Sequence, residues 1–549
     1  MLQALKSRYP SPPRWLFGAA AALALGFLLL TYYRVWSPQY GITRLIQIGT
    51  VFDQRGLAVY RATPKYMDPY PPDRWGFDGQ YYAELSLDPL LRDPQIKVAL
   101  DDPPYRARRI LLPWIAHVLG MGHPWATINI YAALNLLFWL PYVAILYFLF
   151  RGKGWRGWAG FCALLLTCGI IECMKGSLTD FPAFVLMTAG LALGGWAGAC
   201  CLGLAGLTRE VSIIATAGLY RYRPPWGRAF WRNVGLSLVA GGPMALWWAY
   251  IWWKLRMHTH GDTDNIDLPF RGMAQKFVEV VGMARRGEIH WLQAYKNEYV
   301  HAILTMIAVV TQSAYLLTHR EWTNRFWRVG AIFIPFFFVI SHQQWESHFT
   351  ITRQALPITL AFNLILALRP TRRWLLWFVL GNCFVPYGIS LFHSIGRQVP
   401  HMPEVTYVGL PQTGDALTVR YGEGWSGGEW NAQKSWRWAV QKQATLVVAN
   451  AEKHPQRIAL NFTTTSISPR TLRIRAQGKD IWLGQINPDP RTGERLYTPV
   501  RTLPVTLPPG ETKFEFATPQ PLDTAGNDPR TLAFMVAGLE VIALPPAAP

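Results

Sequence analysis

The sequence predicts a chain of two parts: an α-helical polytopic membrane domain of about 11 helices over residues 1–395, then an all-β, jelly-roll-like sandwich over residues 396–549. Up to about residue 395 the chain is a series of apolar runs, and a bilayer core needs roughly 20 apolar residues per helix. After that point the chain is polar, and its apolar residues alternate with polar ones. With 51% hydrophobic and 16% charged residues, the chain is too apolar for an ordinary soluble protein.

The apolar runs give the expected helices in order. The first, Trp15 to Tyr33, carries no charge, and no small-residue cleavage site follows it, so we expect a retained helix and not a signal peptide. A shorter stretch at about 110–121 is expected at the membrane interface or as a re-entrant segment. The expected helices cover about residues 15–33, 124–150, 157–173, 181–194, 196–207, 211–220, 233–254, 300–318, 329–341, 355–368 and 374–394.

Basic residues set the expected orientation. They cluster before the first run and in the short connections at 151–156, 221–232, 320–328 and 369–373, and short basic loops stay in the cytoplasm. The N-terminus is therefore expected in the cytoplasm, whereas the long loops at about 34–109 and 256–299 and the C-terminal domain are expected outside it. Because these clusters account for most of the net charge of +20, we expect no nucleic-acid partner.

The C-terminal part reads as β-strands. The segments DALTVRYGEGW, ATLVVANA, RIALNFTTTSI, RTLRIRA and KFEFAT alternate apolar and polar residues and are separated by turn signals such as LPPG. A tryptophan-rich stretch, with Trp425, Trp430, Trp436 and Trp438, suits either sugar stacking or the core of a sandwich, and core packing is the favoured interpretation. The six cysteines all lie in apolar segments, which indicates buried small side chains and not a disulfide framework.

Charged residues gather at the expected outer ends of the helices. An ionisable side chain within a membrane segment costs about 2.5–3.5 kcal/mol, so such residues usually line a functional cavity. On the topology above, the charged residues at the outer face are Asp78, Asp180, Arg209, Glu210, Glu346, His348 and Arg353. This pattern predicts a charged substrate handled at the outer surface.

Several of these residues lie in recognisable motifs. FDGQYYAELSLDPLL, DDPPYRARRILLPWIAHVLG, GSLTDFPAF, AGLTRE and ITRQALPITLAF resemble bacterial members of the GT-C glycosyltransferase superfamily, similar to the mannosyltransferases of glycolipid-anchor assembly. The resemblance covers roughly residues 40–370. It implies a protein of a bacterial cytoplasmic (inner) membrane that transfers a sugar, with inversion, from a polyprenyl-phosphate donor to an extracytoplasmic glycan, lipid or protein acceptor.

The same resemblance makes Asp78 the catalytic acid of the first outer loop or a ligand of a divalent cation, Mg²⁺ or Mn²⁺. Gln80 and Tyr81, its neighbours in the motif, are then expected to bind substrate. One departure is that Asp78 is followed by Gly79, where many members have a second acidic residue. A second acid would have to be Asp68, Asp73, Glu84 or a residue elsewhere.

The chemistry of such a transfer fits the residue types independently. A carboxylate can take the proton from an acceptor hydroxyl. The charge that develops on a leaving lipid phosphate needs cations, and the planar guanidinium of arginine suits phosphate well. The candidate arginines are Arg108, Arg109, Arg209 and Arg353.

Structural interpretations stay open beside the functional ones. Asp78 suits a turn before Gly79, and Asp180 suits a helix N-cap. Arg209 with Glu210, and Arg353 with Glu346, suit structural ion pairs, whereas Arg108 and Arg109 suit interfacial anchors. The stretch HTHGDTD at 258–264 has the residue types of a metal site, although such loops are usually solvated.

Two other classes of protein also fit the sequence. A transporter or flippase of lipid-linked sugars also needs charges among short helices, but we find no paired halves with matching broken helices. A non-catalytic membrane scaffold that displays a carbohydrate-binding domain would leave the charged outer turns unexplained.

Overall fold

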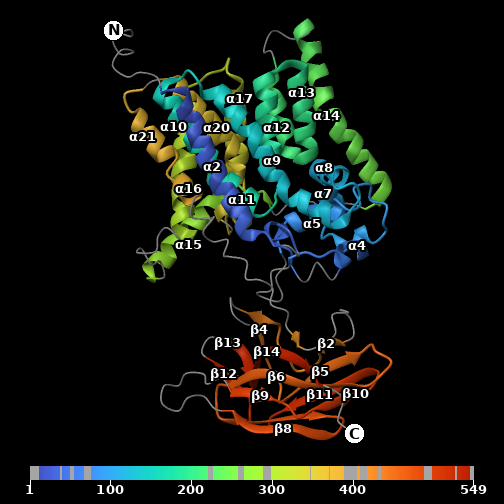
Figure 1. Cartoon of the computed structure of the whole chain (residues 1–549). Helices are drawn as coiled ribbons and strands as arrows, with labels where there is room; N and C mark the ends of the chain where they lie inside the picture. The colour runs from blue at the N-terminus through green and yellow to red at the C-terminus, as the bar shows by residue number, and fades with distance from the viewer. Residues whose placement is uncertain are drawn as a thin grey trace. The chain divides into compact units, whose positions relative to one another are not determined.

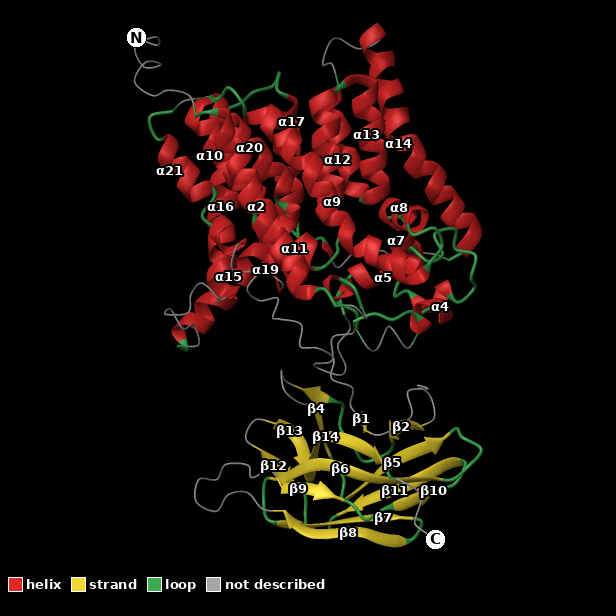
Figure 2. Ribbon diagram, in the orientation of Figure 1, coloured by secondary structure: helices red, strands yellow, loops and turns green. Residues whose placement is uncertain are grey.

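The structure is a computed structural model, and it describes residues 12–37, 40–49, 55–66, 76–220, 227–257, 265–287, 298–346, 348–369, 371–388, 405–408, 417–430, 435–486, 498–525 and 528–544. The chain forms two compact units, one helical, whose described residues end at 388, and one built of β-strands, described from residue 405 (Figures 1 and 2). Each unit has its own hydrophobic core.

Helices and short turns make up the first unit. Their bounds are α2 Arg14–Val35, η1 Thr43–Ile46, α4 Ala58–Ala62, α5 Gly79–Leu85, α6 Ile96–Ala99, α7 Pro103–Ala107, α8 Leu111–Leu119, α9 Pro124–Phe150, α10 Gly154–Leu165, α11 Cys168–Lys175, α12 Asp180–Leu193, α13 Gly195–Thr208, η2 Glu210–Leu219, α14 Arg228–Leu255, α15 Arg271–Arg285, α16 Glu298–Thr318, α17 Arg325–Phe338, α18 His342–Glu346, α19 His348–Gln354, α20 Leu356–Leu368 and α21 Trp374–Gly381.

Five segments of the described chain are long and apolar enough to cross a membrane. They are Arg14–Val35, Pro124–Phe150, Gly154–Lys175, Arg228–Leu255 and Tyr299–Thr318. The other apolar helices, including α12, α13, η2 and α20, are shorter than a span. The expected count of about 11 spans stays a prediction, because several expected helices are broken: the run at 211–220, for example, is the 3-10 helix η2.

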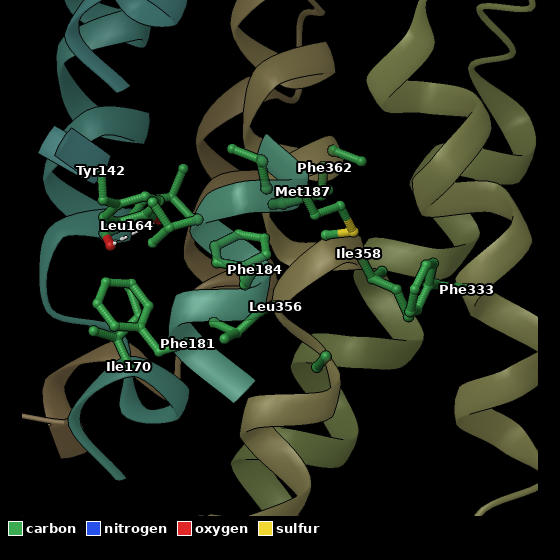
Figure 3. Close-up of a cluster of buried hydrophobic side chains, with 14 of the residues drawn as sticks. Tyr142, Leu164, Ile170, Phe181, Phe184, Met187, Phe333, Leu356, Ile358 and Phe362 are labelled. Carbon is green, nitrogen blue, oxygen red and sulfur yellow. Dashed lines mark hydrogen bonds between the residues drawn. The ribbon is translucent and has the colours of Figure 1, made fainter. Parts of the chain in front are cut away.

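Side chains from α9, α12, α17 and α20 meet in the core of the helical unit (Figure 3). Tyr142 of α9 and Phe181 of α12 contact edge to face, with ring centroids 5.3 Å apart. Where α12 and α13 approach, a Cβ on Gly198 would lie 2.4 Å from the carbonyl oxygen of Gly190. Small residues therefore allow these two helices to pack with their backbones in contact, which is common between membrane helices.

The expected outer loop at 256–299 contains a helix that sequence reasoning did not predict, α15. Of the cysteines, all free, Cys168 and Cys173 are buried as expected, whereas Cys200 is exposed on α13. Between its ends α2 exposes apolar side chains, among them Leu23 and Leu29, whereas the exposed Arg14 and Arg34 lie in its first and last turns, an arrangement that suits a helix in a bilayer.

The second unit consists of strands. Their bounds are β1 Val405–Val408, β2 Leu417–Tyr421, β3 Glu429–Trp430, β4 Ser435–Trp438, β5 Gln443–Asn450, β6 Gln456–Ser466, β7 Arg470–Ala476, β8 Lys479–Ile486, β9 Thr498–Arg501, β10 Val505–Leu507, β11 Gly510–Ala517, β12 Asp523–Ala525, β13 Asp528–Leu532 and β14 Phe534–Ala543. One sheet runs β10-β6-β14-β4-β3, with β1 beside β14 and β9 beside β6, and another runs β2-β5-β11-β7-β8.

The two larger sheets share one core. Leu446 of β5 and Phe514 of β11 come from one sheet, Leu460 of β6 comes from the other, and all three belong to a single buried cluster. Along β5, buried and less buried residues alternate, as the sequence predicts. Trp425 and Trp438 are packed: the Trp425 ring lies 5.4 Å from that of Phe516, and Trp438 is buried. The side chain of Trp430 lies outside the described residues.

Candidate active site

Asp78 immediately precedes α5, but its side chain does not cap that helix. Its Oδ1 instead lies 3.1 Å from Nη1 of Arg106, and its side chain is 32% exposed. Gly79 does not have a positive φ, and its small size has another reason: a Cβ there would lie 2.2 Å from the carbonyl oxygen of Gly176. The Asp–Gly pair therefore permits a close approach between the start of α5 and the turn after α11. Asp78 also lies in a turn, since the N–H of Gln80 donates to the carbonyl of Phe77 at 3.1 Å, so the turn interpretation and the functional one stand side by side.

Arg106 connects Asp78 to a second acid, Asp101. Its Nε and Nη2 donate to the two oxygens of Asp101 at 2.8 and 2.6 Å, which is a bidentate pair. The guanidinium also lies over the ring of Tyr81, 4.5 Å from its centroid. Sequence reasoning missed Asp101 and Arg106, although both lie in the motif DDPPYRARR. The available local signal was Asp102 followed by two prolines, which is typical of a helix start, and Asp102 is the N-cap of α7.

Arg109 forms a bidentate pair with Glu210, from a distant part of the chain. Its Nε and Nη2 lie 3.0 and 2.9 Å from the Glu210 oxygens, and it also donates to the hydroxyls of Tyr82 and Tyr105, each at 2.7 Å. The alternative pairing of Glu210 with Arg209 is wrong. Arg209 is in extended backbone between α13 and η2, so neighbouring side chains diverge there.

Asp180 is held between two arginines. Its Oδ1 lies 2.6 Å from Nη1 of Arg209, and its Oδ2 lies 3.2 Å from Nη1 of Arg353. Thr179 holds the N-cap position of α12, so Asp180 is not the cap. The side chains of Asp180 and Arg353 are only 5% and 7% exposed. Arg353 thus pairs with Asp180, and the side chain of its expected partner Glu346 lies outside the described residues.

The surrounding arginines control the charge of Asp78. Burial alone would raise the pKa of Asp78, but the positive charges of Arg106, Arg353, Arg109 and Arg209 outweigh it and hold that pKa below the usual range of an aspartate. The carboxylate is therefore ionised at neutral pH, and it can accept a hydrogen bond from a hydroxyl or bind a cation. Arg209 and Arg353, which pair with Asp180, therefore also act electrostatically on Asp78.

A small cavity of about 70 Å³ adjoins the Asp180 arginines. Asp180, Arg209 and Arg353 form its charged end. Its remaining wall is mostly apolar and is supplied by α12, η2, α17 and α20, with Phe333, Phe336, Phe337, Ile340 and Val211 among the lining residues. Because Phe336 is 47% exposed, the apolar wall continues onto the outer surface of the unit.

Other expected site residues lie elsewhere. Gln80 is buried, and its Oε1 accepts a hydrogen bond from the backbone N–H of Gly49 at 2.9 Å, so it holds a neighbouring loop segment. Arg108 lies over the ring of Trp248 of α14, 4.8 Å from the centroid. The side chain of His348 lies outside the described residues. Roles of these residues in substrate binding stay predictions.

The structure describes one of the three named candidates for a second acid, and it bears on the expected metal site. Glu84 is buried and accepts a hydrogen bond from the backbone of Leu57, whereas Asp68 and Asp73 lie outside the described residues, as does the stretch at 258–264. Among the residues that the structure describes, no group of three or more His, Cys, Asp and Glu side chains could hold a metal ion.

Comparisons with known proteins find few similarities. No family model matches the chain, and no curated protein matches it. The arabinosyltransferase EmbB from Mycobacterium smegmatis is similar over 95% of this chain and 64% of its own, with 12% identity and a TM-score of 0.28. An exo-β-1,3-galactanase from Phanerochaete chrysosporium, solved with β-1,3-galactotriose, is similar over 22% of this chain and 26% of its own, with 17% identity and a TM-score of 0.12. The chain therefore spans less than two thirds of either protein, and at these TM-scores we take neither likeness as a guide to activity.

Proposed function

We propose that this chain is a membrane glycosyltransferase. It takes a sugar from a polyprenyl-phosphate donor and transfers it, with inversion, to a glycan, lipid or protein acceptor outside the cytoplasm of a bacterium. The observation that supports this most is a partly exposed carboxylate, Asp78, that pairs with Arg106 and interacts electrostatically with Arg209 and Arg353, which line an apolar cavity.

The donor phosphate is proposed to bind at Arg209 and Arg353. Both line the cavity, and Nε of Arg353 is a buried donor without a hydrogen-bond partner among the described residues. A buried donor of this kind is costly unless a ligand or water satisfies it, and a phosphate oxygen suits a guanidinium. The phenylalanines of α17 would contact the first isoprene units of the lipid.

Asp78 is proposed to be the catalytic base. The acceptor hydroxyl oxygen forms the new bond to the anomeric carbon, on the face opposite the phosphate, while the bond from that carbon to the phosphate oxygen breaks. The hydroxyl proton passes to Asp78, and the bonding electrons leave with the polyprenyl phosphate, whose negative charge the arginines stabilise. The lowered pKa of Asp78 makes it a weak base, so this step suits a transition state with advanced departure of the phosphate.

A Mg²⁺ or Mn²⁺ ion at Asp78 stays a prediction of the family resemblance. The described surroundings of Asp78 do not fit a resident dication well. The positive charges of four arginines act on its carboxylate, and Asp101, which shares Arg106 with it, is already paired. We therefore derive no step through a metal.

The test is the envelope glycan profile, by mass spectrometry, of a deletion strain of the source organism. The strain is complemented with the wild-type protein, with Asp78→Asn or with Asp267→Asn, all expressed at equal levels. Asp267 is a matched control, since it belongs to an exposed pair with Arg271 outside the site.

We expect the wild type and Asp267→Asn to restore a missing sugar and Asp78→Asn to fail. Full restoration by Asp78→Asn would show that Asp78 is structural, and it would favour the transporter or the scaffold. In that case, the next measurement is whether the protein forms a covalent sugar–acceptor product. An enzyme forms this product, whereas a transporter only translocates the lipid-linked sugar and a scaffold does neither.

A further inference from the structure

The helix α15 exposes a continuous apolar stripe. It lies in the connection between α14 and α16, both of which are long and apolar enough to span a membrane (Figure 1). Phe270, Phe277 and Val278 are 52%, 52% and 69% exposed. Together with the exposed Ala274 and the half-buried Val281, they follow the i, i+4, i+7, i+8, i+11 spacing of one helix face.

The face of α15 that packs on the helical unit is mixed: Gly272, Lys276 and Val280 are buried, and Met273 packs against the main hydrophobic cluster. An ion pair belongs to this packed face. Lys276 is only 3% exposed, and its Nζ lies 2.9 Å from Oε1 of Glu279. Glu279 also contacts His342 of α18 at 3.3 Å. Nearby, a Cβ on Gly272 would lie 2.4 Å from the carbonyl oxygen of Ile340, so the backbone of α15 is fixed against the unit. The exposed stripe therefore does not result from loose packing.

The exposed half of α15 has two distinct sides. With about 100° between successive residues, the apolar stripe is centred near Phe277 and Val281, whereas Gln275 and Arg286 lie on a separate exposed polar side. One side of the helix thus contacts protein, one is apolar and one is polar. A helix at the edge of a bilayer contacts protein, lipid and water, and these three sides suit those three environments.

We propose that α15 is an interfacial helix whose apolar stripe inserts into the headgroup–acyl boundary of the outer leaflet. The neighbouring helices α14 and α16 are both long and apolar enough to cross a membrane, and a connection between two spans begins and ends at the membrane surface. Exposed Arg271, Arg285 and Arg286 at its two ends suit lipid phosphates.

The same apolar surface reaches the candidate active site. The ring of Phe270 lies 4.5 Å from that of Phe338, which follows Phe337 in the wall of the cavity. Ile340, whose carbonyl contacts the start of α15, also lines the cavity. An interfacial α15 therefore places the apolar wall of the cavity at the membrane depth where the phosphate of a lipid is joined to its hydrocarbon chain.

The test is photo-crosslinking of the full-length protein in nanodiscs of phosphatidylethanolamine and phosphatidylglycerol. The photoreactive residue p-benzoylphenylalanine replaces Phe277 on the stripe or, as a matched control, Gln275 on the polar side. Val278, which is more exposed, is a second stripe position if Phe277→p-benzoylphenylalanine does not purify as a monodisperse protein. Mass spectrometry after irradiation measures the fraction of protein that carries a covalent lipid.

We expect the lipid adduct to be several-fold more abundant at position 277 or 278 than at 275. Equal adduct yields at the stripe and at Gln275 would overturn the proposal. A crosslink from the stripe to the β unit or to a second copy of the chain, in place of lipid, would also overturn it and would identify that protein as the occupant. None of these outcomes depends on glycosyl transfer, so the result is separate from the test of Asp78.

Discussion

Asp180 neutralises two arginines with one carboxylate, and its removal should be costly. In Asp180→Asn, Arg353 and Arg209, which are 7% and 18% exposed, lose their only ion-pair partner among the described residues. Removing one member of a buried ion pair costs about 3–5 kcal/mol, because a charge is left buried without compensation. An exposed pair, such as that of Asp267 with Arg271 at 3.3 Å, contributes only about 0–1 kcal/mol.

The assay compares the free energies of unfolding of Asp180→Asn and Asp267→Asn. Unfolding in mixed micelles can be followed by tryptophan fluorescence, and we expect the difference between the two variants to be at least about 2 kcal/mol. Combining Asp180→Asn with Arg353→Met should recover part of the loss, because an apolar side chain replaces the unpaired charge. If Asp180→Asn destabilises the protein no more than Asp267→Asn, the inference that Asp180 anchors a buried charge cluster is refuted.

Three further predictions follow from the site. The lowered pKa of Asp78 means that its ionic contribution to stability is present at neutral pH and is lost as the pH falls below the usual pKa of an aspartate and through the lowered one. Arg106→Gln should move this loss, and the acidic limb of the pH–rate profile, to higher pH, and an unchanged limb would contradict the electrostatic assignment. Gly79→Ala should destabilise the protein by about 1–3 kcal/mol through a backbone clash, whereas Gly242→Ala, where a Cβ meets nothing within 4 Å, should not; equal melting temperatures would exclude the close approach. Arg109→Lys should lower transferase activity although the charge is retained, because a lysine cannot make the bidentate pair and both tyrosine contacts, and wild-type kinetics would show that this geometry is dispensable.

The sequence predicted individual helices and strands where the pattern of neighbouring residues is clear. The charge-free run from Trp15 to Tyr33 predicts a helix, and α2 covers Arg14–Val35. The alternating segment ATLVVANA predicts a strand, and β5 covers Gln443–Asn450 with alternate residues buried. Both predictions work because helix and strand periodicity, and the length of an apolar run, are properties of neighbouring residues.

The sequence predicted several members of the candidate site, although it missed Asp101 and Arg106, and it did not predict the pairings. Of the expected residues, the structure brings Asp78, Arg109, Asp180, Arg209 and Arg353 into one electrostatic cluster. The alternative interpretation, an ion pair of Arg209 with Glu210, is wrong, because neighbouring side chains on an extended backbone point to opposite sides.

Only the tertiary structure shows which charged residues, distant in sequence, form pairs. Arg109 and Glu210 are 101 positions apart, and no periodicity links them. Asp101 became relevant only because Arg106 contacts it together with Asp78. Gly79 is required by the carbonyl of Gly176, which lies in the turn after α11, far from Gly79 in sequence. The sequence by itself determined which segments are apolar and which residues carry charge; the fold determined the partners, because Coulombic and steric contacts depend on distance in space and not on separation along the chain.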